Sequence, residues 1–265
     1  MARVVYPLVA EESCNKGHMF EAYESIFSRR GQAYHRAMQL VPRARRNEFS
    51  AALEQAGLRR GDVVCDVPSG GGYLADHLPP DLELRLIAID PSDVFARTWR
   101  DKRVEWHLAP LAALPLPDAG VDALVSIAGL HHVDDRQAVL REMRRVLRPG
   151  GRLSILEVPV GAVTDRFLNG FVDRHNSMGH EGRFVDDGFR ADVTAAGFRI
   201  ETDELCRYTW NFSSEGEMIE FINLMFWLDK ATPEVILEGL RDILGVDAVD
   251  GSCKMNWELQ RIIAA

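Results

Sequence analysis

The sequence predicts an α/β fold built around a mostly parallel, Rossmann-like sheet with helices on both faces. Two observations lead to this fold class. Short apolar runs alternate with helical segments between residues 62 and 158, and this alternation is typical of βαβ units. The runs are also rich in Val, Ile and Leu over most of their length, as expected for strands that are buried on both faces of a parallel sheet.

The segment before the first strand, residues 1–60, is expected to form an N-terminal helical cap. Apolar side chains recur at a spacing of three and four between residues 20 and 27, which predicts an amphipathic helix. A basic run at residues 43–46 is interpreted as a solvated helix face, because such runs usually are. Residues 61–265 are then expected to form one domain, which is an ordinary size for a single core.

Each strand of that domain is expected where a short apolar run is bounded by turn residues. The first five strands follow one another with only short helices or turns between them, and the last two come after a break in the alternation. The expected strands cover residues 62–67, 84–89, 104–108, 121–127, 152–158, 198–203 and 254–263.

Helix signals fill the intervals between these runs. Residues 73–78 are expected to form a helix after a glycine-rich turn. Asp134 and Asp135 supply an N-cap for a helix with one apolar stripe, and the glycines that follow Arg148 end it. A further helix is expected at residues 187–196, just before the sixth strand.

Two segments depart from the regular alternation. Residues 161–185 carry Gly, Asn and His without a clear period, and a long segment of that kind is typical of a lid or binding loop. Residues 213–245 are expected to be a helical insertion before the last strand. The part of this insertion at residues 218–228 is apolar on nearly all sides. Together with Trp210 it suggests a hydrophobic pocket wall, but a core helix or a homodimer interface explains the same pattern equally well.

The composition restricts the function. The chain has 31 Lys and Arg against 40 Asp and Glu, a net charge of −9, which argues against a broad nucleic-acid-binding surface. The four cysteines are far apart, so neither a zinc knuckle nor a disulfide framework is indicated. No apolar run is long enough to span a bilayer or resembles a secretory signal, so a cytoplasmic protein is expected.

The glycine-rich turn at residues 66–72 is the first candidate for a ligand-binding site. Between a strand and a helix, such a turn lets backbone N–H groups approach a ligand closely. Asp90 ends the next strand, and a carboxylate there would face the same crevice and could accept two ribose hydroxyls. The alternative is that Asp90 only caps the turn before Pro91.

Several motifs together resemble the class I S-adenosylmethionine-dependent methyltransferases, in particular the small-molecule and quinone-methylating "type 11" group. The turn at residues 66–72 and Asp90 are similar to the first two motifs of this family. Residues 114–118 and 121–132, which end in His131-His132, resemble its Leu-Pro turn and fourth strand, and residues 142–151 resemble its next helix and turn. In order and spacing these motifs cover roughly residues 60 to 160.

The resemblance implies S-adenosyl-L-methionine as the cofactor and a small-molecule substrate. It places Asp66, Gly70 and Gly72 at the methionine half of the cofactor, Asp90 at the ribose, Leu111 at the adenine and Ser126 or Ala128 at the sulfonium. Pro68 and Pro91 adjoin these positions and complete the implied binding set. Pro68 stands where the family usually has its first glycine, and Pro110 where many relatives carry an Asp that holds the adenine amino group.

Methyl transfer needs alignment of the nucleophile with the methyl group, and it needs a base only when the nucleophile carries a proton. His131 and His132 follow the fourth strand at the crevice, so they are candidates for that base; capping of the next turn is the alternative. His175, in the expected lid, is a third candidate. His175, His180 and Asp173 are metal-ligating residue types, but their loop spacing is unremarkable, so no metal is expected.

Three functions therefore remain open. The first is a methyltransferase that acts on oxygen, carbon or nitrogen of a small, largely apolar metabolite. The second is a member of the same fold that binds cofactor or a partner without catalysis, which Pro68 and Pro110 favour. The third is a nicotinamide dehydrogenase, but that class predicts a GxGxxG spacing that residues 68–73 do not supply.

Overall fold

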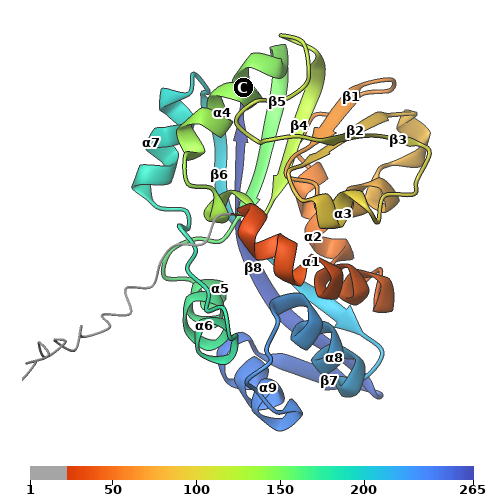
Figure 1. The fold of residues 1–265 in the computed structure, drawn as a ribbon, viewed down its shortest axis with the longest axis vertical. Coiled ribbons are helices and arrows are strands. Elements are labelled where there is room, and N and C mark those ends of the chain that lie inside the picture. The colour runs from red at the N-terminus through yellow and green to blue at the C-terminus, as the bar shows by residue number, and fades with distance from the viewer. Residues whose placement is uncertain (1–22) are drawn as a thin grey trace, which may run out of the picture.

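The computed structural model describes residues 23–265, so the part of the expected cap at residues 1–22 lies outside the described residues. Its centre is one sheet with the strand order β3-β2-β1-β4-β5-β8-β6, and β7 pairs with β8 (Figure 1). The first five strands are parallel to one another, whereas β8 runs antiparallel to β5, β6 and β7. The expected α/β class with a mostly parallel sheet is confirmed.

The bounds of the strands agree with the apolar runs in most cases. The strands are β1 Val63–Asp66, β2 Arg85–Asp90, β3 Val104–Leu108, β4 Val121–Ile127, β5 Leu147–Glu157, β6 Ile200–Phe212, β7 Val246–Val249 and β8 Ser252–Ala264. The helices are α1 Tyr23–Leu40, α2 Arg46–Leu53, η1 Tyr73–His77, η2 Pro80–Leu82, α3 Asp93–Ala96, η3 Leu130–His132, α4 Arg136–Val146, α5 Val163–Asp165, η4 Arg166–Val172, α6 Asp173–His175, α7 Asp187–Ala195, α8 Glu215–Phe226, α9 Pro233–Gly239 and η5 Leu240–Leu244.

Helices cover both faces of the sheet. On one face α4 and α7 bury their apolar stripes against β1, β2 and β5, and the side chain of Asp135 caps α4 as expected. On the other face the residues of α2 and α8 join a larger core with β2, β6 and β8. Each face of the sheet therefore packs against its own layer of buried side chains. This packing holds the carboxyl ends of the parallel strands in place.

Several elements differ from the sequence expectation. Strand β5 starts at Leu147, five residues before the expected start, so α4 ends at Val146 and the glycines after Arg148 lie in the strand instead of ending the helix. Strand β7 was not expected; it forms by pairing with β8.

Strand β6 continues to Phe212, nine residues beyond the expected end, because it pairs with β8 along its whole length. The expected lid at residues 161–185 begins with consecutive helical turns from Val163 to His175, since Phe167, Leu168 and Phe171 pack into the core and outweigh the weak helix propensity of its Gly and Asn.

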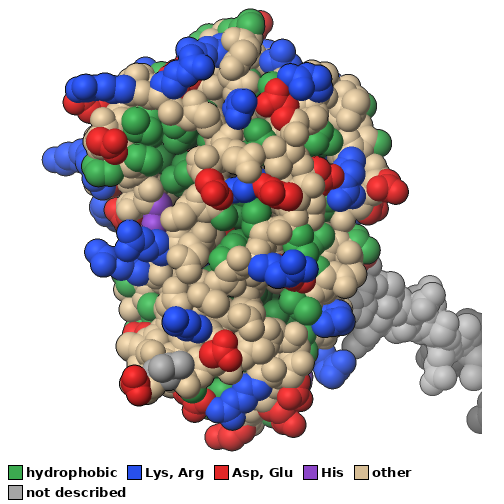
Figure 2. All heavy atoms as spheres, turned by 180° about the vertical axis from the view of Figure 1, so that it is seen from behind, with side chains coloured by type: hydrophobic (Ala, Val, Ile, Leu, Met, Phe, Trp, Pro, Cys, Tyr) green, Lys and Arg blue, Asp and Glu red, His purple; other side chains and the backbone are tan. Residues whose placement is uncertain are grey.

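Helices α5, α6, α8 and α9 gather at one end of the molecule, beyond the parallel strands, where β6 and β8 extend past the rest of the sheet (Figure 1). Helix α1 crosses in front of the sheet between this end and α3. Among the described helices none is long and apolar enough to cross a membrane. Acidic and basic side chains are interspersed over the face that Figure 2 shows.

Candidate active site

The glycine-rich turn leaves β1 at Asp66 and leads into η1. Gly70 and Gly72 have φ values of 55° and 73°, the left-handed region that glycine adopts without strain. A Cβ atom on Gly72 would lie 2.0 Å from the ring of Trp106, so only glycine fits there. The turn is thus built for close approach of its backbone to neighbouring groups.

Pro68 occupies the first position of this turn without disturbing it. It follows a cis Val67–Pro68 peptide bond and is not among the residues with positive φ. Its ring packs against Gly129, where a Cβ atom would come within 2.4 Å of the Pro68 Cγ atom. Proline therefore meets the backbone requirement of this position, but it offers no N–H group to a ligand.

Asp90 is fully buried at the carboxyl end of β2. Its Oδ1 accepts a hydrogen bond from the Ser92 N–H (2.8 Å), which is the turn cap considered above. Its Oδ2 faces the crevice and accepts from the Gly70 N–H (2.7 Å) and the Tyr23 hydroxyl (2.8 Å). Burial raises the pKa of Asp90 to about 7, although these three donors act in the opposite direction. This geometry is compatible with both interpretations of Asp90, as a turn cap and as an acceptor for ribose hydroxyls.

Helix α1 covers the crevice through Tyr23 and Phe27. Tyr23 packs on Phe27 with ring centroids 4.5 Å apart, and Phe27 packs on Phe95 of α3 at 5.2 Å. The cavity below α1 measures about 90 Å³, room for a few water molecules. In this structure the Tyr23 hydroxyl occupies the hydrogen-bonding position on Asp90 Oδ2 that the sequence predicts for a ribose hydroxyl.

Asp66 supplies a second buried carboxylate at this edge. It lines the cavity, and among the described residues its carboxylate has no hydrogen-bond or ion-pair partner. Burial, and then the charge of Asp90, raise the pKa of Asp66 well above its usual range. A buried carboxylate in this situation favours a cationic ligand group, such as an ammonium.

The structure brings some of the sequence-predicted cofactor residues to the cavity and leaves others behind it. Asp66, Pro68, Gly70 and Ala128 line the cavity, and Ala128 has a φ of 48°. The remaining residues do not line it. Pro91 is partly buried, and the others are buried: Leu111, Ser126, Gly72 and Asp90, the last of which is hydrogen-bonded to two lining residues.

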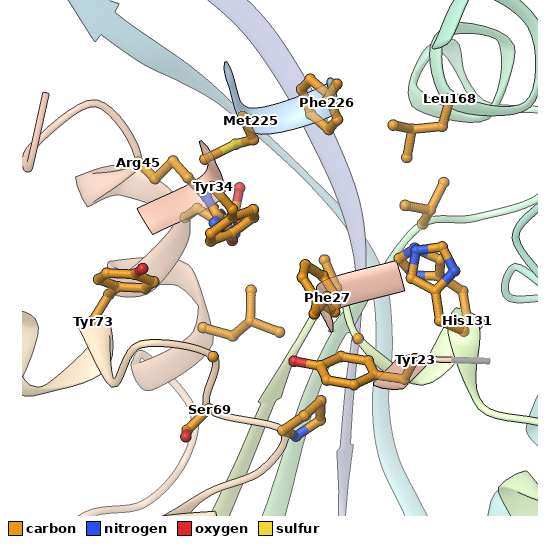
Figure 3. Close-up of a pocket in the computed structure, with 18 of the residues that line it drawn as sticks. Tyr23, Phe27, Tyr34, Arg45, Ser69, Tyr73, His131, Leu168, Met225 and Phe226 are labelled. Carbon is orange, nitrogen blue, oxygen red and sulfur yellow. Dashed lines mark hydrogen bonds and ion pairs between the residues drawn. The ribbon is translucent and has the colours of Figure 1, made fainter. Parts of the chain in front are cut away.

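Histidines form the opposite end of the cavity from Arg45 and Tyr73 (Figure 3). His131 lies on η3, after β4, and its Nδ1 is 2.6 Å from Oε1 of the fully buried Glu157. Oε2 of Glu157 accepts the N–H groups of Leu130 (3.0 Å) and His131 (3.2 Å). The sequence prediction missed Glu157, although an acid at the end of a parallel strand is itself a signal for the crevice.

His132 and His180 complete this end. The ring of His132 lies 4.0 Å from that of His131 and 5.1 Å from that of His180, centroid to centroid. Burial, and then repulsion from His131, lower the pKa values of His132 and His180 well below the usual range. Both rings are therefore neutral near pH 7.

His175 does not join this group. It packs against Phe171 with ring centroids 4.5 Å apart and does not line the cavity. Asp173, the third member of the metal set considered from sequence, accepts the backbone N–H of His180 at 2.9 Å. The structure thus brings His180, and not His175, to the two histidines that follow β4.

Arg45 and Glu48 were missed as site residues, and the interpretation of the basic run as a solvated face is wrong for Arg45. Arg45 is only 5% exposed because it ion-pairs with Glu48 and donates to Tyr34. The Trp210 indole N–H donates to the other carboxylate oxygen of Glu48 at 2.9 Å. No local pattern reveals this cluster, since its members meet only in the fold.

Aromatic and thioether side chains line the wall above the cavity. Met225 and Phe226 of α8, with Trp210 and Trp257, face it (Figure 3 shows the two α8 residues). Other members of α8, such as Phe221, are fully buried in the core. The pocket-wall and core-helix interpretations are therefore both correct, for different faces of α8.

Comparisons with known proteins agree with this arrangement. Residues 65–155 match the family described as a methyltransferase domain. A ubiquinone/menaquinone biosynthesis C-methyltransferase of Enterobacter sp. (strain 638) is 35% identical over 189 residues, 65% of this chain and 73% of the relative. A 27-O-demethylrifamycin SV methyltransferase of Amycolatopsis mediterranei is 34% identical over 60% of this chain and 63% of the relative.

Solved structures show the same fold. The geranyl diphosphate C-methyltransferase of Streptomyces coelicolor, crystallised with Mg²⁺, geranyl diphosphate and S-adenosyl-L-homocysteine, matches with a TM-score of 0.52 and 14% identity over 82% of this chain and 78% of that one. The chain is 35% identical to the Enterobacter C-methyltransferase and covers 73% of its length. It also carries the glycine turn after β1 and the acid at the end of β2. The chain therefore belongs to the class I S-adenosylmethionine-dependent methyltransferases.

Proposed function

We propose that this protein transfers a methyl group from S-adenosyl-L-methionine to oxygen, carbon or nitrogen of a small, largely apolar acceptor. One observation carries the proposal: a single cavity is lined by the glycine turn, by the histidines after β4 and by the aromatic wall of α8. Donor and acceptor that bind side by side in this cavity, once the start of α1 has moved to widen it, can be aligned for in-line displacement, which is the main task in methyl transfer.

The cofactor would be held by the residues at the carboxyl edge of the parallel strands. The Asp66 carboxylate suits the ammonium of the methionine half, and Asp90 suits the ribose hydroxyls once Tyr23 has moved. Ala128 would border the sulfonium and Leu111 the adenine. When bound, S-adenosyl-L-methionine supplies an electrophilic methyl group on a good leaving group.

His131 is the best-placed base. Glu157 is a carboxylate that already accepts three backbone N–H groups, so its contact with the His131 Nδ1 atom requires the proton on Nδ1. The lone pair then lies on Nε2, which is free to accept a proton from a hydroxyl or an acidic carbon of the acceptor. Glu157 is a positioning residue for this step.

The acceptor would be selected by the helical parts around the core domain. Tyr34 belongs to the cap at residues 1–60, Leu168 and His180 to the segment at residues 161–185, and Phe226 to the insertion at residues 213–245, and all four line the cavity. An aromatic or aliphatic body would pack against Phe226, whereas a polar substituent would face Arg45 and Glu48. The relatives' names include both C- and O-methylation, so the acceptor atom is left to experiment.

Two measurements test the proposal. Calorimetry is expected to show one S-adenosyl-L-homocysteine bound per chain, and a radiolabelled methyl group is expected to reach at least one member of a panel of phenols, quinols and aliphatic alcohols. Absence of nucleoside binding contradicts the proposal. Tight nucleoside binding without transfer to any acceptor favours instead a member of the family that binds without catalysis.

A further inference from the structure

Three imidazole side chains converge at the end of the cavity that lies opposite Arg45 and Tyr73 (Figure 3). His131 and His132 come from η3 and His180 from the loop after α6, and all three are less than 10% exposed. One ring nitrogen from each lies within 4.8 Å of the others. Within residues 23–265, no other three His, Cys, Asp or Glu side chains are so placed for a metal ion.

The hydrogen bonds behind two of the rings fix their tautomers. Glu157 holds the proton of His131 on Nδ1, as argued above. The Oδ1 atom of Asn169 accepts the Gly182 N–H (2.9 Å), and its Nδ2 donates to the Gly182 carbonyl (3.2 Å). Since Oδ1 of this amide is an acceptor, the His180 Nδ1 at 3.0 Å must be the donor. Both Nε2 atoms therefore carry free lone pairs.

The third ring lacks such a partner. The Nδ1 atom of His132 is buried, and among the described residues it finds no hydrogen-bond partner. A buried polar atom without a partner is unfavourable, so a ligand that satisfies this imidazole would stabilise it.

The charged groups around the three rings include both signs. The buried Arg30 of α1 acts on His132 and His180 as a positive charge and opposes a bound cation. Glu157 contacts His131, and Asp173 accepts the backbone N–H of His180; both carboxylates favour a cation. Carboxylate and amide acceptors behind ligating histidines are the usual outer partners of metal sites.

We propose that His131, His132 and His180 form a binding site for one divalent transition-metal ion of the zinc type. Three imidazole nitrogens are a donor set that suits zinc better than magnesium or calcium. Zinc–nitrogen bonds of about 2.0 Å require the rings to approach one another further, by rotation of side chains. This proposal replaces the expectation from sequence that no metal is bound.

The remaining coordination position of such an ion would face the cavity, because all three histidines line it. Its natural occupant is a water molecule or an oxygen of the acceptor, so the site would favour acceptors with a hydroxyl or carbonyl group over purely hydrocarbon ones. This consequence rests on the proposed function, whereas metal binding itself does not. An ion on the Nε2 atom of His131 would also prevent that atom from acting as a base.

Zinc binding can be measured directly on the full chain, freed of any affinity tag and dialysed against a chelator. Calorimetry with Zn²⁺ is expected to show one ion per chain, and Co²⁺ is expected to produce the visible absorption of a four-coordinate site. His132→Gln and His180→Gln are each expected to weaken zinc binding at least 100-fold. His175→Gln, the same change in a histidine outside the group, is expected to leave it unaltered.

If a variant does not fold, the Zn²⁺ titration of the wild-type chain still decides whether the site exists. No stoichiometric Zn²⁺ binding to the wild-type chain overturns the proposal, and so does equal affinity in wild-type protein and a folded His180→Gln variant. S-adenosyl-L-homocysteine binding to the metal-free protein, measured in parallel, separates this outcome from failure of the proposed function.

Discussion

Asp90 is the residue on which the cofactor assignment depends most. Its Oδ2 atom already accepts two hydrogen bonds, one of them from a side chain that can leave. We expect Asp90→Asn to weaken S-adenosyl-L-homocysteine binding about 10- to 100-fold, the scale of losing charge-assisted hydrogen bonds. Calorimetry measures this, and Asp93→Asn on the exposed start of α3 is the matched control. Equal affinity in wild-type and Asp90→Asn protein would show that the ribose lies elsewhere.

The raised pKa of Asp90 also predicts how stability depends on pH. The pKa is about 7 in the folded protein and about 3.9 in an unfolded chain, so folding favours the protonated carboxyl. The resulting contribution to the free energy of unfolding is complete below pH about 4 and is lost as the pH rises to about 7. The lowered pKa values of His132 and His180 act in the opposite direction.

A comparison of wild type with Asp90→Asn isolates this contribution. Urea unfolding at pH 5 and pH 8 is expected to show that the wild-type protein loses more stability with rising pH than the variant, by a few kcal/mol. Parallel pH dependences in the two proteins would mean that Asp90 is ionised in the fold already at pH 5.

Glu157 is expected to act on catalysis through His131. Glu157→Gln removes the carboxylate that requires the proton on the His131 Nδ1 atom, so we expect kcat to fall about 10- to 100-fold with little change in KM for the cofactor. The pH profile of kcat should shift as well, because the basicity of His131 changes. A variant with unchanged kcat and an unchanged profile would make Glu157 a purely structural group.

At the scale of elements, α1 covers the crevice where we propose that the cofactor binds. It is held there by the Tyr23–Asp90 hydrogen bond and by ring packing of Phe27 on Phe95. If the ribose binds Asp90 as proposed, one of its hydroxyls would compete with the Tyr23 hydroxyl for the same carboxylate oxygen. Cofactor binding is therefore expected to require displacement of the start of α1.

Tyr23→Phe tests this competition. The variant lacks the competing hydroxyl but keeps the ring, so we expect S-adenosyl-L-homocysteine to bind several-fold more tightly and the free energy of unfolding to fall by about 1 kcal/mol. Calorimetry and urea unfolding measure the two effects. Weaker nucleoside binding in Tyr23→Phe would mean that the hydroxyl contacts the nucleoside instead of competing with it.

The bounds of several helices and strands could be predicted from the sequence. β4 agrees with its predicted bounds residue for residue, and α4 starts directly after the predicted cap Asp135, because periodicity and capping are local properties of the chain. The full length of β6 could not be predicted, since its second half is a strand only through pairing with β8. The helical turns of η4 likewise depend on burial of Phe167 and Leu168.

At the scale of the whole molecule, the cavity is assembled from parts that are distant in sequence. The glycine turn and Asp90 were predictable, because a strand end and a turn mark them locally. Tyr23 on Asp90 and Trp210 on Glu48 join residues 67 and 162 positions apart, and nothing in the local sequence announces either contact. The same holds for His180, which meets His131 only through the fold.

The central claim is that one cavity, closed by α1, holds the nucleoside at Asp90 and the methyl acceptor beside the histidines. A crystal structure with bound S-adenosyl-L-homocysteine tests it most directly. We predict that the ribose hydroxyls lie on the Asp90 carboxylate, that Tyr23 has turned away, and that the sulfur faces His131. A nucleoside bound elsewhere, with the Tyr23–Asp90 hydrogen bond intact, would contradict the claim.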